Sequence, residues 1–386
     1  MIKMIKKWWV RAFTNNPWRV VPFEKLYPGI SGQPLDLPET LNGILCREQG
    51  AVIDYVPPPH PLNSELQLRF INGKPRYLGG GLFKEPDRFI FSLGRAGIIG
   101  QLGLAYAIDK RSFIDESAKE WTRRLDRSAY VGALNLPERK RLAGISFSFL
   151  TIGAEAGYYH FLFESIPKAG LFGTMLSRAD HLLFNGPATD WKLKWLRKAG
   201  IDTTKIIWMD GASHYECEQL VFTSRLIADQ QISAWCLGTL SKLFGLSAGL
   251  PPATSPRKVI LISRKGLGKR EISWESEILN AFPEIEKVDF SALGPDETIH
   301  KLRNTTHIIG PHGAGLSNIY LCRPGTKVME IYPEKVTYQP CYQRISALCR
   351  LEYVLMYLNF HDASDPQTGF KAFDQALNLF LGDSPV

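Results

Sequence analysis

The sequence predicts an α/β protein with two α/β halves that face each other across a cleft, preceded by an irregular N-terminal region of short strands. From residue 145 onward apolar segments alternate with amphipathic ones, as expected for βαβ units in a mostly parallel sheet. This alternation stops at the proline-rich residues 249–256 and then restarts. We therefore expect an N-terminal region at 1–140 and two α/β domains at 141–250 and 251–386.

The N-terminal region lacks the regular alternation. Short strands are expected at 51–56, 65–71 and 88–92, because apolar residues there are bounded by Pro and Gly turns. Helical spacing begins only at residues 113–125, where the charges suit a solvated face.

Each half is predicted to alternate between strands and helices. In the first half, after an apolar segment at 145–152, we expect a helix at 158–175 interrupted at Pro167, strands at 181–185, 205–209 and 218–223, and helices at 189–199 and 230–244. In the second half, we expect strands at 259–263, 287–290, 307–310, 327–332 and 353–358, and helices at 273–282, 295–303, after Gly315, 338–349 and 370–381.

Composition limits the class of protein. The chain has 386 residues, is 45% hydrophobic, and contains no apolar run of the roughly 18 residues that a membrane-spanning helix needs. Its six cysteines show no CxxC pair, so we expect reduced thiols, a cytoplasmic location and no metal site. The net charge of +8 favours anionic partners, but the basic residues are spread along the chain, which argues against a nucleic-acid binder.

Basic and apolar residues alternate in residues 1–13, where Lys and Arg are interspersed with Ile, Trp and Phe and no acidic residue occurs. Such a segment can lie in an anionic membrane interface, which would make the protein peripheral on the inner membrane. The alternatives are a frayed terminus or a helix packed on its own domain.

The residues His307–Asn318 read as a strand, a glycine-bearing turn and the start of a helix. In a parallel sheet this arrangement brings backbone N–H groups and a helix N-terminus to the carboxyl edge, where anions bind. His312 could donate to a phosphate oxygen, while Gly313 and Gly315 allow close approach of a ligand. The same residues also fit an ordinary strand–turn–helix corner.

Two further groups belong to the same predicted edge. Arg264 and Arg270 follow the strand at 259–263 and can contact phosphate oxygens, although a solvated basic loop is the alternative. Glu330 ends the strand at 327–332 and could accept hydrogen bonds from ribose hydroxyls. Alternatively, its role could be structural, as a cap or as the ion-pair partner of a nearby lysine.

In the first half, His160, Glu164 and Lys168 are spaced four residues apart and share one helix face. A carboxylate beside an imidazole suits a general base. An exposed ion pair on an aromatic helix would give the same spacing.

Taken in order, these motifs resemble glycosyltransferase family 61, which includes bacterial proteins of capsular polysaccharide biosynthesis. The resemblance covers about residues 145–360, and its most specific part is the histidine–glycine–alanine turn followed by Pro-Gly and a strand ending in Glu330. Where the family usually has Trp, Asp and Arg, this chain has Phe161, Glu164 and Lys168, and Trp274-Glu275 replaces its Asn-Glu pair.

The resemblance implies two Rossmann-like domains of the GT-B type and metal-independent transfer from a nucleotide sugar to a glycan or polysaccharide acceptor, with inversion. No cofactor is implied. His160 and Glu164 would be catalytic, and Tyr159 and Lys168 would lie on the acceptor side. The donor side would be formed by Ser263, Arg264, Arg270, His312, Gly313, Ala314, Gly315, Asn318 and Glu330.

Two other functions remain open at the level of sequence. One is a pyruvyl- or phosphoryl-transfer enzyme of polysaccharide assembly that uses a different anionic donor. The other is a non-catalytic scaffold that keeps the fold.

Overall fold

A computed structural model describes residues 18–27, 43–48, 52–54, 82–117, 130–131, 133, 135–227, 232–246, 252, 256–268, 270–333, 339–358 and 366–382. The chain forms two compact units. The first comprises Met1–Ala51, Lys84–Asp229 and Trp235–Gly245; the second comprises Val52–Phe83, Gln230–Ala234 and Leu246–Val386. The boundaries predicted at residues 140 and 250, and the cleft between the halves, stay predictions.

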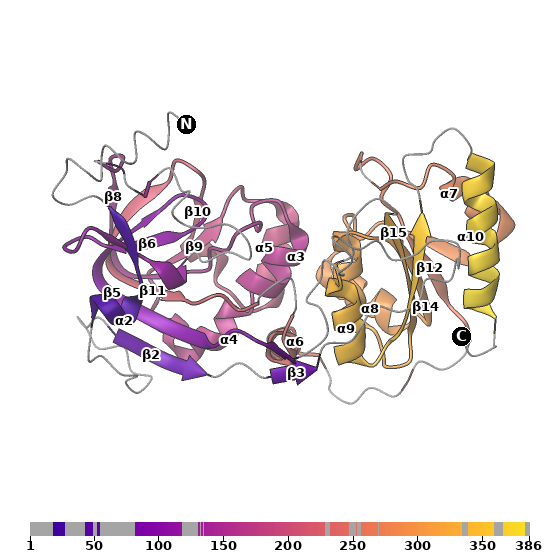
Figure 1. Cartoon of the computed structure of the whole chain (residues 1–386), viewed down its shortest axis with the longest axis horizontal. Coiled ribbons are helices and arrows are strands. Elements are labelled where there is room, and N and C mark those ends of the chain that lie inside the picture. Colours follow the sequence, from indigo (N-terminus) through magenta and orange to yellow (C-terminus); the bar gives the residue numbers. More distant parts are fainter. Residues whose placement is uncertain are drawn as a thin grey trace. The chain divides into compact units, whose positions relative to one another are not determined.

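The first unit is built on a nine-stranded mixed sheet (Figure 1), in the order β1-β7-β6-β5-β11-β8-β9-β10, with β2 paired to β5. Its strands are β1 (Arg19–Val21), β2 (Gly43–Glu48), β5 (Arg88–Ile99), β6 (Leu104–Ala107), β7 (Ser112–Ile114), β8 (Lys140–Ser148), β9 (His181–Asn185), β10 (Ile206–Met209) and β11 (His214–Thr223). Strands β8, β9, β10 and β11 are parallel to one another, as the alternation of apolar and amphipathic segments predicts. Antiparallel pairing enters where β11 meets β5.

The helical segments of this unit are short. They are α2 (Phe23–Leu26), α3 (Tyr158–His160), a π-helix (Phe161–Ser165), α4 (Lys168–Phe172), α5 (Asp190–Lys198), α6 (Ala234–Leu243, in this unit from Trp235) and 3₁₀ turns at Asp115–Ser117, Gly173–Arg178 and Thr203–Lys205. The interruption expected at Pro167 is present, because proline lacks the N–H that would continue the helix.

The helix predicted at 113–125 is wrong at its start. Phe113 lies in β7 and pairs with Tyr106 of β6, so sheet pairing overrides the local helical spacing. Residues 118–129, the predicted strand at 65–71 and the basic segment 1–13 lie outside the described residues.

The second unit contains a five-stranded sheet in which every pair of neighbours is parallel. Its strands, in spatial order, are β13 (Ile285–Val288), β12 (Val259–Ile262), β14 (His307–Pro311), β15 (Lys327–Pro333) and β16 (Glu352–Leu358). Numbered along the chain this order is 2-1-3-4-5, a common doubly wound arrangement that binds ligands where the order reverses. That reversal lies between β12 and β14. A separate pair is formed by β3 (Val52–Asp54) and β4 (Leu82–Lys84).

Helices cover both faces of this sheet (Figure 1). They are α7 (Glu275–Ala281), α8 (Pro295–Arg303), a 3₁₀-helix (Ala314–Leu321), α9 (Cys341–Cys349) and α10 (Pro366–Leu381). On one face Trp274, Phe373 and Leu377 pack with strand residues such as Leu261 and Met329. The strand expected at 287–290 instead spans Ile285–Val288. It lies at the edge of the sheet, and only its two end residues are buried, whereas Glu286 and Lys287 are exposed. The apolar pattern that would locate this strand in the sequence is therefore weak.

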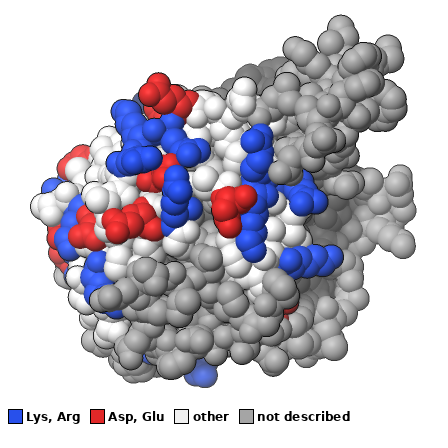
Figure 2. All heavy atoms as spheres, turned by 90° about the vertical axis from the view of Figure 1, so that its left-hand side faces the viewer, with Lys and Arg blue, Asp and Glu red and all other residues white. Residues whose placement is uncertain are grey.

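Charges of both signs lie next to one another on the face of the first unit shown in Figure 2. The described residues there form no large area of a single sign, which agrees with the spread of basic residues along the sequence. Among the helices that the structure describes, none is long and apolar enough to cross a membrane.

Gly97 of β5 allows the aromatic core of the first unit to form. A Cβ at this position would lie 1.9 Å from Cζ of Tyr106, whose side chain is fully buried. The Tyr106 hydroxyl is also fixed by a 2.5 Å hydrogen bond with His214 Nε2, so the ring has little freedom to move away.

We therefore predict that Gly97→Ala lowers the free energy of unfolding by about 1–3 kcal/mol, the usual cost of overpacking a core. Urea denaturation of the full chain would measure the loss. Gly238→Ala is the matched control, because no atom lies within 4 Å of its added Cβ on α6. Equal stability of the two variants would contradict this description of the core.

Candidate functional site

His160 and Glu164 form a pair close to the carboxyl end of β8. His160 Nδ1 lies 2.7 Å from Glu164 Oε1, and the Thr151 hydroxyl donates to Glu164 Oε2 at 3.3 Å. The Glu164 side chain is 3% exposed, whereas that of His160 is 19% exposed. The carboxylate can therefore orient the imidazole from below while the ring remains accessible, which is the arrangement of a general base and its partner.

Two local features position His160. Gly153 has φ of 87°, and a Cβ there would lie 2.5 Å from His160 Cδ2, so the ring packs directly on the backbone of the loop after β8. The following turn is π-helical, with the Ile166 N–H donating to the Phe161 carbonyl at 3.1 Å. Single π-turns of this kind are often found at functional sites.

Two buried lysines tie this loop to the sheet. Lys168 Nζ donates to the Leu150 carbonyl, and Lys192 Nζ donates to the carbonyls of Glu155, Asn185 and Pro187 at 2.8, 3.0 and 3.2 Å. Burial lowers the pKa of each lysine to about 8, although Glu164 opposes the shift at Lys168 and Glu155 opposes it at Lys192. Lys168, expected on the acceptor side, is thus bound to the backbone beneath the loop.

The Asn185 side chain completes the attachment. It accepts from the Thr151 N–H at 3.0 Å and donates to the carbonyls of Gln101 and Thr151 at 2.6 and 2.9 Å. Sequence reasoning missed both Asn185 and Lys192. Lys192 could have been found from its spacing, because it shares the buried face of α5 with Trp195 and Leu196.

Tyr159 packs against the pair from the side. Its ring centroid lies 5.5 Å from that of His160 and 4.9 Å from that of Phe163, and the side chain is buried. The residues predicted for the first half, Tyr159, His160, Glu164 and Lys168, are therefore gathered on one short helical segment.

In the second unit, Arg264 and the glycine turn meet where the strand order reverses. Arg264 follows β12 and Gly313 follows β14. A Cβ at Gly313 would lie 1.9 Å from Arg264 Nη1 and 2.7 Å from Cζ, so the guanidinium lies directly on the glycine backbone. Burial lowers the pKa of Arg264, and the positive charge of Arg270 lowers it further. The two cations therefore lie close to each other.

Ser263 has a structural contact network. Its hydroxyl lies 3.0 and 2.9 Å from the two carboxylate oxygens of Glu275, and Lys287 Nζ lies 2.7 Å from Glu275 Oε2. Ser263 Oγ also accepts from the Lys265 N–H at 3.2 Å. These bonds attach the end of β12 to the start of α7 and thereby fix where the Arg264 side chain leaves the sheet.

His312 is held by a buried carboxylate. Its Nδ1 is hydrogen-bonded to Glu330 Oε1, and the Tyr353 hydroxyl donates to Glu330 Oε2. Glu330 is 0% exposed and His312 is 7% exposed. The rings of Tyr332 and Tyr342 pack beside the imidazole, with centroids at 4.5 and 5.2 Å. The contact expected between Glu330 and a ribose stays a prediction; in the structure this carboxylate faces His312 and Tyr353.

The remaining donor-side residues lie in or beside the 3₁₀-helix Ala314–Leu321. Gly315 packs over Ile262, since its added Cβ would be 2.8 Å from Ile262 Cγ2. Asn318 is buried, and its Nδ2 donates to the Gly315 carbonyl at 3.3 Å. Arg264, His312 and Gly313 thus form the centre of this site, whereas Asn318 and Ser263 support its backbone.

No metal centre is evident in the part of the chain that the structure describes, where no three His, Cys, Asp or Glu side chains gather as metal ligands. Metal-independent chemistry itself stays a prediction.

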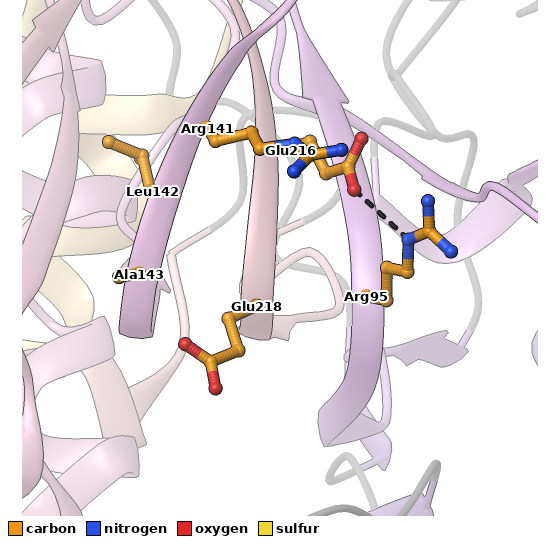
Figure 3. A pocket seen from close by; sticks show the side chains of 6 residues that line it. All are labelled: Arg95, Arg141, Leu142, Ala143, Glu216 and Glu218. Carbon is orange, nitrogen blue, oxygen red and sulfur yellow. Dashed lines mark hydrogen bonds and ion pairs between the residues drawn. The ribbon is translucent and has the colours of Figure 1, made fainter.

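A separate hollow of about 350 Å³ lies on the sheet of the first unit (Figure 3). It is lined by Arg95, Arg141, Leu142, Ala143, Glu216 and Glu218. Glu216 accepts from Arg95 at 3.0 Å and from Arg139 at 2.6 Å, and the two arginines of the lining are balanced by its two glutamates. This pairing makes the hollow a poorer anion site than the end of β12.

Comparison with known families gives one match. The model of the family described as Glycosyltransferase 61 matches residues 158–329. The matched segment begins at the helix that carries His160 and contains Arg264, Arg270 and the glycine turn; it stops one residue before Glu330. None of the curated proteins matches the chain.

The packing of Arg264 on Gly313 leads to a specific prediction. Gly313→Ala should displace the flexible guanidinium and weaken binding of inorganic pyrophosphate about tenfold, the loss of roughly one charge-assisted hydrogen bond. Titration calorimetry would measure the affinity.

Stability should change little in this variant, because Gly313 has an extended backbone (φ 167°) and the obstructing atoms end a mobile side chain. Gly294→Ala is the control in the same unit, since its nearest contact would be an ordinary 3.4 Å. Unchanged pyrophosphate affinity in Gly313→Ala would show that Arg264 does not bind anions from this position.

Proposed function

We propose, from the match of residues 158–329 to glycosyltransferase family 61, that this protein transfers a sugar from a nucleotide-sugar donor to a hydroxyl of a glycan or polysaccharide acceptor. The single observation that carries the proposal is the convergence of Arg264, Gly313 and His312 at the reversal point of a doubly wound sheet. This is where such folds bind phosphorylated ligands.

The second unit would bind the donor. A nucleotide sugar carries two negative charges on its diphosphate, and the guanidinium of Arg264 can form paired hydrogen bonds with phosphate oxygens. Arg270 adds positive charge nearby, as its effect on the pKa of Arg264 indicates. Gly313 lacks the Cβ that would displace the Arg264 guanidinium, and Gly315 lacks the one that would meet Ile262. These charges would stabilise the leaving nucleoside diphosphate, which gains charge as the glycosidic bond breaks.

The first unit would activate the acceptor. His160 Nε2 would remove the proton of an acceptor hydroxyl, while Glu164 holds Nδ1 and stabilises the imidazolium that forms. The hydroxyl oxygen would bond to the anomeric carbon from the face opposite the diphosphate. The bond between that carbon and the phosphate oxygen breaks, and its electron pair leaves with the nucleoside diphosphate. The result is inversion at the anomeric carbon.

The two units would then be the acceptor and donor domains of a GT-B enzyme. We also propose that the reaction is metal-independent and serves the synthesis of cell-surface or capsular polysaccharide in the cytoplasm, with residues 1–13 at the inner membrane. The resemblance to family 61 and the basic N-terminal sequence support these points.

Activity is best tested by screening nucleotide sugars and glycan acceptors for release of nucleoside diphosphate. With the donor and acceptor that show activity in this screen, His160→Ala should lower kcat by about 10²–10⁴-fold. Donor affinity should be unchanged, since a base acts on the chemical step. Arg264→Ala should instead weaken nucleoside-diphosphate binding by about tenfold or more.

His300→Ala is a suitable control, because His300 is an exposed histidine in the last turn of α8, where its ring is hydrogen-bonded to Asn304. Stabilisation by phosphoenolpyruvate and not by nucleotides would favour the pyruvyl-transfer alternative. Capture of partner transferases without any nucleotide binding would favour the scaffold.

A further inference from the structure

The environment of His312 limits how this residue can contact an anion. Nδ1 faces the carboxylate of Glu330, which accepts hydrogen bonds, so Nδ1 carries a proton. Among the described residues no group is hydrogen-bonded to Nε2. Nε2 can donate to a phosphate oxygen only when the ring carries both protons; a neutral ring with its proton on Nδ1 would present a lone pair and repel the anion.

Glu330 holds the Nδ1 side of the ring from a buried position. It is fully buried, and its two oxygens are occupied by His312 and by the Tyr353 hydroxyl. Arg264 and Arg270 add positive charge to the same region. A buried carboxylate in contact with the ring interacts with it more strongly than a solvated one, since little water screens the interaction.

The other ionisable groups around His312 keep one charge state near neutral pH. Burial raises the pKa values of Tyr332 on β15 and of Cys341 and Tyr342 on α9 well above their usual range. Tyr353 on β16 donates its proton to Glu330, and the two arginines stay charged. Between about pH 6 and 8.5, a change of protonation in this cluster therefore concerns the His312–Glu330 pair.

We propose that binding of a nucleoside diphosphate in the second unit is coupled to uptake of a proton by His312, with Glu330 and Tyr353 as the positioning residues that hold Nδ1–H. The bound diphosphate stabilises the imidazolium through Nε2–H, so the ligand and the proton bind cooperatively. By linkage, affinity falls as pH rises through the range in which free His312 loses its proton. This inference rests on the proposed donor site and adds its mode of anion recognition.

Titration calorimetry with inorganic pyrophosphate and a set of nucleoside diphosphates tests the coupling. Measurements at pH 8, in buffers of different ionisation enthalpy, count the protons taken up on binding. At this pH the phosphate groups of a nucleoside diphosphate are ionised, whereas inorganic pyrophosphate still holds a proton, so protons are counted with the nucleoside diphosphates and pyrophosphate reports affinity alone. The wild-type protein should take up a substantial fraction of one proton at pH 8 and progressively less toward pH 6.

Three variants separate positioning from mere structural support. His312→Gln should abolish proton uptake, and Glu330→Gln should greatly reduce it and weaken affinity at pH 8 by about tenfold. Tyr353→Phe should give a smaller change in the same direction and provides a second route if Glu330→Gln does not fold. Glu352→Gln, an exposed carboxylate at the start of β16, is the matched control and should behave as wild type.

Tight binding with no proton uptake at pH 8, or affinity that rises with pH, would overturn the inference and leave the donor site intact. The second result would mean that the ligand binds better when the ring of His312 is neutral. Failure of every nucleoside diphosphate and of pyrophosphate to bind at any pH would contradict both the inference and the proposed function.

Discussion

The contact between the Arg264 guanidinium and the backbone at Gly313 is the constraint on which the site of the second unit depends. It brings the segment after β12 and the turn after β14 together at the point where the strand order reverses. Any side chain larger than hydrogen at position 313 would occupy the volume of Nη1. The glycine therefore does more than permit a turn, because it leaves room for the cation that a diphosphate would contact. The Ser263–Glu275–Lys287 network fixes the other end of this arrangement.

Buried polar groups play a comparable part in the first unit. Lys192, Lys168 and Asn185 attach the loop after β8 to the sheet through backbone carbonyls and amides. Each bond replaces one that these groups would make with water, and leaving any of them unpaired in the interior would be costly. The loop is thereby held beneath His160, whose ring packs on Gly153. The two sites thus share a design in which a buried carboxylate, Glu164 or Glu330, orients a histidine.

Much of the fold follows from patterns along the sequence, and particular residues show why the rest does not. The strand His181–Asn185 and the helix Pro295–Arg303 have the predicted bounds, because apolar spacing and local signals agree there. Phe113 escaped prediction, since its strand also pairs with β1, where Val20 is its partner, and local spacing does not encode a pairing so distant in the sequence. His312, Gly313 and Arg264 could be identified from motifs, but their contact could not, because it joins residues far apart in the chain. The burial of Glu330 against Tyr353 was hidden for the same reason.

A crystal structure of the protein with a bound nucleoside diphosphate would test the central claim, that the reversal point of the second sheet is the donor site. The account predicts the diphosphate within hydrogen-bonding distance of the Arg264 guanidinium and His312 Nε2, beside Gly313. A diphosphate bound elsewhere, for example in the hollow lined by Arg95 and Arg141, with Arg264 still packed on an empty turn, would contradict it.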